Sequence, residues 1–243
     1  MAERTTIGFD RRIDIEWLDA AAGRVAAGDP PAQVREFLWN LLEGAVGGDS
    51  VHSARGKTLT VLMRIWVTVP SIAESLRDAA IKRIPLASPE ERLAMHWAMS
   101  IACYPFFSEV TAHAGKLLTL HEQVNVSQII RRMTEIWGDR STLPRAVQRV
   151  LRSIVQWGTL REGTNKGIFI PPSRRIALSE DLAELLAQAI LVSHGRGMSF
   201  WQVSSHPALF PFDARLNSLL VRKSNRLRIS RQGDETDFVE LET

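Results

Sequence analysis

Apolar residues recur at every third or fourth position over most of the chain, which predicts a mainly α protein. In residues 32–46, "AQVREFLWNLLEGAV", this spacing follows two prolines and stops at Gly47, and Asp29 is the expected N-cap. Residues 57–69 are apolar on nearly every side, which is typical of a helix at the centre of a helical core.

A further helix start is marked by Ser88 as N-cap, Pro89 in the first turn and Glu91 in the position that completes a capping box. With the helices before it, this signal predicts four to five helices ahead of Pro105, in an N-terminal helical domain.

The middle of the chain shows a different order of elements. A helix over residues 106–123 leads into a short extended piece, "VNV", and then into a second helix over residues 128–137 with Ser127 as its expected N-cap. A third helix over residues 144–157 and two short strands around "GTNKG", within residues 159–170, follow. We therefore expect helix, strand, helix, helix and hairpin.

The third of these helices has two contrasting faces. Apolar residues form a stripe at i, i+3, i+4 and i+7, which predicts burial of Val147, Val150, Leu151 and Ile154. Polar residues at i, i+4, i+7 and i+11 are expected to form one exposed ridge of Arg145, Arg149, Arg152 and Gln156.

The C-terminal part begins with Ser179, the expected N-cap of a helix with an acidic first turn. An aromatic-rich segment after it is expected to pack against the body of the protein. The last residues, "LRISRQGDETDFVEL", predict a β-hairpin that joins either the sheet of the middle unit or the edge of a partner. The predicted domains are residues 1–104, 105–178 and 179–243.

Charge is distributed unevenly along the chain. The formal net charge is +3, yet residues 127–175 hold ten basic and three acidic residues, a net charge of +7, so the remainder carries −4. A cationic segment on a mildly acidic body is the electrostatic footprint of a phosphate-binding surface. The plain alternative is a solvated helix face, which runs of charge usually are.

Element order, the stretch "VLRSIVQWGTL" before a glycine-bracketed hairpin, and the placement of charge resemble the winged helix-turn-helix family over residues 106–178, under a third of the chain. The resemblance implies that the third helix enters the major groove of DNA and that the hairpin, the wing, contacts phosphates. Arginine can pair with guanine or clamp phosphate, and glutamine can pair with adenine. The implied groove-facing residues are Arg145, Gln148, Arg149 and Arg152. The remaining expected DNA contacts are Arg131, Arg132, Arg140, Arg161, Lys166, Arg174 and Arg175.

The resemblance thus predicts a non-enzymatic protein whose partner is double-stranded DNA, acting as a transcriptional regulator or as an accessory subunit of a DNA-handling or phage-defence system. The N-terminal helices would then hold a protein partner or form a homodimer. Since some winged-helix domains dock protein instead, a scaffold subunit is the alternative. Binding of single strands or RNA is a third reading, which requires exposed aromatic rings such as Trp137 and Trp157.

Other chemistry finds little support in the sequence. Gly56, Lys57 and Thr58 end a stretch that suggests a phosphate loop, but the first glycine of that motif is replaced by Val51 and no strand precedes it. The six histidines show no metal-binding spacing and Cys103 is the only cysteine. We therefore expect no enzyme activity, no metal and no cofactor. The lack of a secretory signal or long apolar span favours a cytoplasmic protein without a membrane segment.

Overall fold

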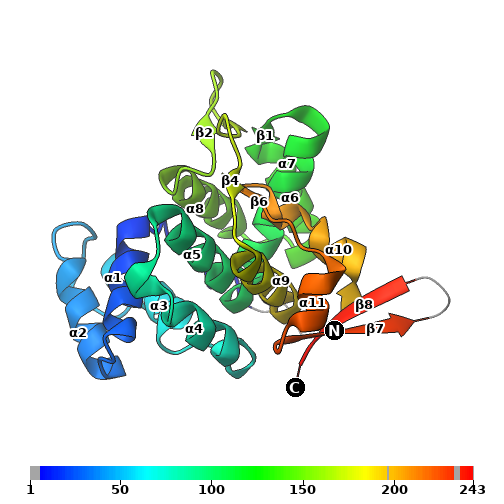
Figure 1. Ribbon diagram of the computed structural model, residues 1–243. Coiled ribbons are helices and arrows are strands. Elements are labelled where there is room, and N and C mark those ends of the chain that lie inside the picture. Colours follow the sequence, from blue (N-terminus) through cyan, green and yellow to red (C-terminus); the bar gives the residue numbers. More distant parts are fainter. Residues whose placement is uncertain (1–5, 196, 233–235, 243) are drawn as a thin grey trace.

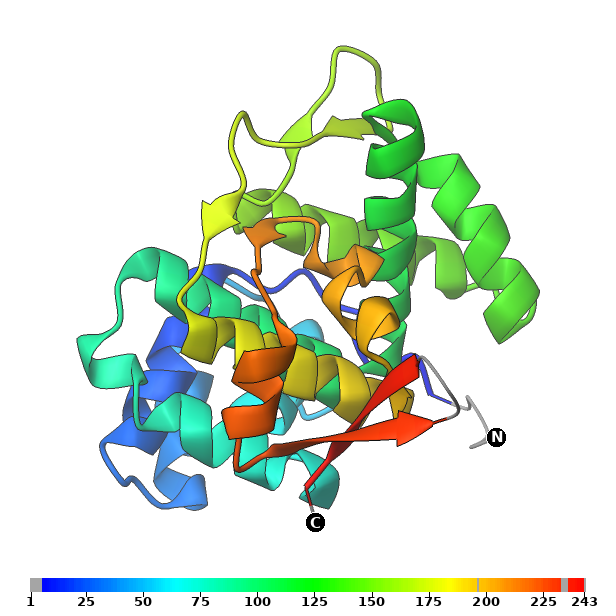
Figure 2. The same ribbon diagram turned by 45° about the vertical axis from the view of Figure 1, so that its right-hand side comes forward.

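Two buried helices, α5 (Pro89–Cys103) and α9 (Glu180–His194), lie against each other at the centre of the molecule (Figures 1 and 2). The computed structural model describes residues 6–195, 197–232 and 236–242 and is mainly helical. α5 begins with the expected capping box: Ser88 Oγ accepts from the Glu91 N–H at 3.2 Å, and the Glu91 carboxylate accepts from the Ser88 N–H at 2.8 Å.

The first part of the described chain is helical, as expected. Ahead of α5 it contains α1 (Ile15–Ala26), α2 (Pro31–Leu41), α3 (Ala54–Trp66), the short 3₁₀ helix η1 (Ser71–Ala73), α4 (Glu74–Ile81) and the 3₁₀ helix η2 (Ile84–Leu86). α2 ends earlier than its apolar spacing predicts, and turns rather than helix lead to Val46. Its N-cap is Pro30 rather than Asp29.

The middle part has the predicted order of elements. They are α6 (Pro105–His121), β1 (Val124–Asn125), α7 (Val126–Trp137), α8 (Leu143–Gln156), β2 (Arg161–Glu162) and β3 (Ile168–Ile170). The three strands form one antiparallel sheet in the order β1-β3-β2. The predicted cap of α7 is wrong: Asn125, not Ser127, is the N-cap, and its side chain accepts from the Ser127 N–H at 2.9 Å.

The last part contains the predicted terminal hairpin. Besides α9 it includes β4 (Ile176–Ala177), β5 (Met198–Ser199), α10 (Phe200–Ser204), η3 (Pro207–Leu209), β6 (Phe212–Asp213), α11 (Ser218–Lys223), β7 (Leu227–Gln232) and β8 (Thr236–Leu241). β8 pairs with both β5 and β7 in a sheet of its own, so the hairpin does not join the middle sheet; pairing with a partner's edge stays a prediction. It lies at the opposite end of the molecule from the β2–β3 loop (Figures 1 and 2).

One hydrophobic cluster runs through all three parts of the chain. At its centre Trp97 of α5 makes edge contacts with Phe107 of α6 and with Phe210 and Phe212, and its indole N–H donates to the Ala208 carbonyl at 3.0 Å. The aromatic-rich C-terminal segment therefore packs against the body, as expected. The domain boundaries after residues 104 and 178 stay predictions.

Hydropathy along the helices bears on membrane association. Among the residues that the structure describes, no single helix has the length and apolar character to cross a membrane. Within the described residues, α3 and residues 71–86 have sufficient length and hydropathy only when counted together. They are bent by 56° relative to each other, and α3 is largely buried within the protein.

Candidate nucleic-acid interface

α8 is fixed on the protein by the apolar stripe predicted for it. Val147, Val150, Leu151 and Ile154 are fully buried, and the helix packs on α6 and α7. Gly158 follows its end with a φ of +77°, a left-handed conformation in which glycine carries no steric penalty. The opposite face of α8 is consequently held in a defined orientation.

That opposite face carries three exposed polar side chains, Arg145, Gln148 and Arg152. They lie at i, i+3 and i+7 and therefore share one side of the helix. None of the three forms a hydrogen bond or ion pair within the part of the chain that the structure describes. Two unpaired guanidinium groups and an amide are thus available to a ligand outside the protein.

The predicted ridge of four residues is only half correct, because the N-terminal segment, residues 9–16, crosses one flank of α8. Arg149 donates from Nη1 to the Asp10 carbonyl and is half-buried. Gln156, also half-buried, accepts from the Ile15 N–H at 2.8 Å through Oε1 and donates to Glu16 at 2.8 Å through Nε2. These two side chains therefore bind the N-terminal segment, whereas Arg145 and Arg152 remain exposed.

The β2–β3 hairpin stands beside α8 and projects from the body (Figures 1 and 2). Its inner anchor is Phe169, which is buried and pairs with Val124 of β1. Lys166, near the tip, is exposed and unpaired among the described residues, and Gly167 turns the chain with a φ of +80°. Arg161 is exposed on β2 but donates to the Pro171 carbonyl at 3.2 Å through Nη2.

The basic residues after the hairpin have different surroundings. Arg174 is exposed and has no partner among the described residues. Arg175 donates to the Leu209 carbonyl at 3.3 Å and also to the Phe212 carbonyl. Arg175 therefore ties the β4 strand to the β6 strand, and its guanidinium is largely used within the protein.

The basic residues of α7 and the following turn also differ in exposure and in whether they have a partner. Arg131 is exposed without a described partner. Arg132 forms an i,i+3 ion pair with Glu135 at 2.5 Å, and it lies near His113 of α6, whose pKa is lowered to about 4 mainly by burial and further by nearby positive charge. Arg140 is half-buried and engaged within the protein. Of these three, Arg131 has the least restricted guanidinium.

Trp137 and Trp157 offer no stacking surface for bases. Each is only 4% exposed. The Trp137 indole donates to Glu109 at 3.0 Å, and that of Trp157 to the Ile13 carbonyl at 2.9 Å. The reading that places single-stranded bases on these rings is therefore disfavoured.

Sequence patterns did not point to Arg11, which the structure brings to the flank of α8. Its Nη1 donates to the Asp10 carbonyl at 3.3 Å, the same oxygen that accepts from Arg149. The only local signal is the "DRR" run between the apolar residues Phe9 and Ile13. This run does not reveal where an extended segment docks. The sequence therefore indicates a basic segment only over residues 127–175.

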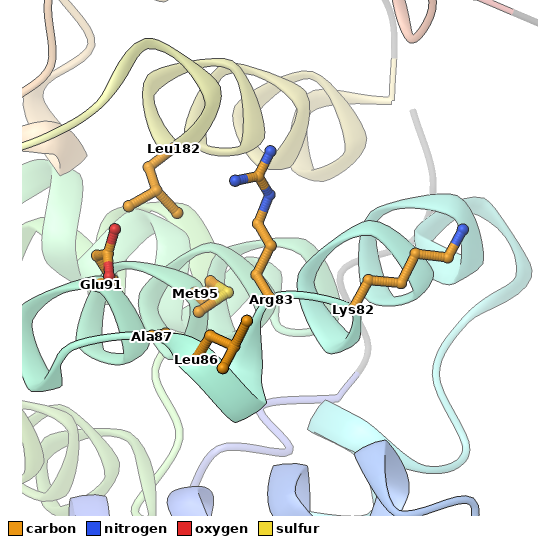
Figure 3. Close-up of a pocket in the computed structure, with 7 residues that line it drawn as sticks. All are labelled: Lys82, Arg83, Leu86, Ala87, Glu91, Met95 and Leu182. Atoms are coloured by element: carbon orange, nitrogen blue, oxygen red, sulfur yellow. The ribbon is translucent and has the colours of Figure 1, made fainter.

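Two surface hollows lie outside this region. One, of about 250 Å³, is bordered by η2, α5 and α9, with Leu86, Met95 and Leu182 on its apolar side (Figure 3). Arg83 extends from η2 toward α9, where it pairs with Asp181 at 2.6 Å (Figure 3). The other, of about 620 Å³, is open and lies between α11 and β7. Ser224 lines the second hollow, and its hydroxyl donates to the Glu184 carboxylate at 2.6 Å.

Titratable groups in the core serve the fold. His96 is fully buried on α5; its Nδ1 accepts from the Trp66 indole at 3.2 Å, so Nε2 carries the proton and donates to Asp19 at 3.0 Å. Burial raises the pKa of the Cys103 thiol to about 12, which keeps it protonated and unreactive. Within the described residues no three of His, Cys, Asp and Glu are grouped as metal ligands.

Comparison of the chain with models of protein families, with curated proteins and with solved structures found no match.

Proposed function

We propose that this chain is a non-enzymatic DNA-binding protein whose winged helix-turn-helix unit, residues 105–178, contacts duplex DNA through α8 and the β2–β3 hairpin. The biological setting we propose is transcription regulation or an accessory role in a DNA-handling or phage-defence system.

The observation that carries the proposal is the exposed face of α8, where Arg145, Gln148 and Arg152 have no partner in the described protein. An α-helix fits the major groove of B-DNA, where arginine can pair with guanine and glutamine with adenine. Among the described residues no acidic side chain lies within ion-pair distance of Arg145 or Arg152. The arrangement suits a polyanion that supplies the missing partners.

Neighbouring elements support the same ligand. The helix, strand, helix, helix and hairpin order and the three-stranded β1-β3-β2 sheet support the proposed winged helix. Lys166 at the hairpin and Arg131 on α7 add unpaired cations to the segment whose net charge is +7. A recognition helix flanked by a basic hairpin would meet both a groove and the adjacent phosphates.

The test is a fluorescence-anisotropy titration of random duplex DNA at several salt concentrations, comparing wild type with Arg145→Ala/Arg152→Ala. Arg149 is left unchanged because it also holds the N-terminal segment. Each lost phosphate contact lowers the slope of log K against log salt by about 0.9, so the double variant is expected to bind more weakly and to lose at most about 1.8 in slope, the value reached if each arginine neutralises its own phosphate.

A matched control removes two exposed helical cations elsewhere, Arg35→Ala/Lys57→Ala, which carry the same change of charge on α2 and α3. α2 lies on the far side of the molecule from the hairpin (Figures 1 and 2). The control is expected to bind nearly as wild type does. Equal loss in both variants, or no binding by wild type, would reject the α8 interface.

The alternative, a docking subunit, is favoured by one observation. Trp201 on α10 is 74% exposed and Leu120 at the end of α6 is 72% exposed, and exposed Trp is enriched at protein–protein interfaces. If the protein is a docking subunit, its DNA binding should be weak and unaffected by Arg145→Ala/Arg152→Ala. Capture of a partner protein should be lost on Trp201→Ala or Leu120→Ala.

A further inference from the structure

Two guanidinium groups converge on one carbonyl oxygen beside α8. The Asp10 oxygen accepts from Nη1 of Arg11 at 3.3 Å and from Nη1 of Arg149. The segment that carries Asp10 is fixed, because the Ile13 N–H donates to Ser153 Oγ at 2.8 Å and the Phe9 and Ile13 side chains are fully buried. The convergence is therefore a feature of the packed protein and not of a loose terminus.

The charges at this point are poorly balanced. Arg11 is only 16% exposed, its Nε has no hydrogen-bond partner among the described residues, and its nearest acid, the Asp10 carboxylate, lies 4.0 Å away. Burial, then the nearby Arg11 and Arg145, lowers the pKa of Arg149 from its ordinary value, and Asp10 opposes this only in part. The Arg149 guanidinium thus has two other guanidinium groups, those of Arg11 and Arg145, and one partly exposed carboxylate, that of Asp10, in its surroundings.

Such a cluster has donors and charge left over for an anion. Each guanidinium has five N–H groups in a rigid fork, of which one carbonyl oxygen occupies few. An anion with several oxygens would accept from more than one fork and would relieve the repulsion between the arginines. A phosphate group of the DNA backbone has this chemistry.

We propose that Arg11, Arg149 and Arg145 together bind one backbone phosphate of duplex DNA, where the N-terminal segment crosses α8. This inference rests on the proposed function and extends it, because Arg11 comes from outside residues 105–178. The phosphate fixes where α8 sits along the groove, and the exposed residues Gln148 and Arg152 meet the bases beyond it. Arg149 holds the Asp10 carbonyl and the phosphate at the same time.

The variant that tests the proposal is Arg11→Gln, and its matched control is Arg12→Gln. Arg12 is the next residue, but it is 55% exposed and already paired with Asp14 at 2.8 Å. Titrations with random duplex DNA should show that Arg11→Gln binds more weakly than wild type and than Arg12→Gln, with a loss of less than about 0.9 in the slope of log K against log salt because Arg149 and Arg145 still hold the phosphate. Arg12→Gln should keep the wild-type slope, and Arg11→Lys, which retains the charge, should keep the slope with weaker binding.

A second measurement avoids any effect of substitution on folding. In the unmodified protein with ¹⁵N-labelled arginine, the Nε–H signals of Arg11 and Arg149 should shift on addition of duplex DNA, and that of Arg12 should not. If Arg145→Ala/Arg152→Ala weakens binding while Arg11→Gln binds as tightly as wild type, and the Arg11 Nε–H signal of the unmodified protein does not move, the phosphate site is refuted and the proposed function survives. If wild type does not bind DNA, both are refuted.

Discussion

Ser153 Oγ accepts a hydrogen bond from the backbone N–H of Ile13 at 2.8 Å, joining positions 140 residues apart. Both groups are buried, and the same hydroxyl donates to the Arg149 carbonyl at 2.9 Å. The contact sets where the N-terminal segment lies on α8, and so it decides which arginines of the helix are exposed and which are covered.

Ser153→Ala should therefore destabilise the protein. The buried Ile13 N–H would lose its acceptor, and an unsatisfied buried donor costs about 1–3 kcal/mol. Urea unfolding measures the change, and Ser141→Ala, at an exposed position before α8, is the control with an expected change within about 0.5 kcal/mol. Equal stability of the two variants would mean that the N-terminal segment contributes little to the fold.

Local signals in the sequence predicted the helices better than their contacts. The stripe of α8 and the capping box of α5 depend on residues three to seven positions apart, so a short stretch contains all the information. The error at Asn125 has a local cause as well: Asn and Ser are both favoured caps, and the sequence held both within two residues of the start of α7.

Contacts between distant segments could not be predicted in this way. The extended residues 9–14 have no periodicity that indicates their docking site, and so the covering of Arg149 and Gln156 was missed. β5 is only two residues long, and its pairing with β8 depends on tertiary packing rather than on strand propensity. The exposure of Arg145 and Arg152 was predicted from helical spacing, whereas the position of Arg11 beside α8 depends on the fold.

Gly115 of α6 lies where η3 of the C-terminal segment packs closely on α6. A Cβ atom at this position would lie 1.9 Å from the Pro207 carbonyl oxygen in η3, which is backbone and can move only with its surroundings. Gly115→Ala should lower stability by about 1–3 kcal/mol, the usual range for overpacking. Gly23→Ala is the matched control, since it lies in α1 with nothing within 4 Å of the added Cβ.

In Gly23→Ala only the helix propensity changes, so stability should rise by about 0.5–1 kcal/mol. Thermal unfolding of the two variants should thus move in opposite directions from wild type. If Gly115→Ala also gains stability, α6 and η3 are less tightly packed in solution than in the structure.

His206 should make stability depend on pH. Its Nδ1 accepts from the Ala208 N–H at 3.3 Å, and its pKa is lowered from 6.5 to about 4, mainly by burial and then by the positive charges of His194 and Lys116. The unfolded chain takes up this proton near pH 6.5, but the folded chain does so only near pH 4. The stabilising contribution is therefore complete above pH 6.5, decreases as pH falls toward 4 and levels off below.

Urea midpoints measured from pH 7.5 to pH 4 should decrease for wild type and decrease less for His206→Asn, whose side chain can still accept from the Ala208 N–H. His113, whose pKa is also lowered to about 4, should account for part of the decrease that remains. His121→Asn, at an exposed position, is the control. A profile of His206→Asn that coincides with wild type would show that His206 is not buried in its neutral form.

Lys166 provides a separate test of the hairpin as a phosphate contact. The side chain is exposed and unpaired within the described structure, so Lys166→Ala should change stability by no more than about 0.5 kcal/mol. If the hairpin lies along the DNA backbone, the variant should bind all duplex sequences more weakly and lose about 0.9 in the slope of log K against log salt. Lys57→Ala, an exposed lysine on α3, removes the same charge and should leave that slope unchanged. Identical slopes for both lysine variants, together with a reduced slope for Arg145→Ala/Arg152→Ala, would restrict the DNA contact to α8 and its N-terminal flank.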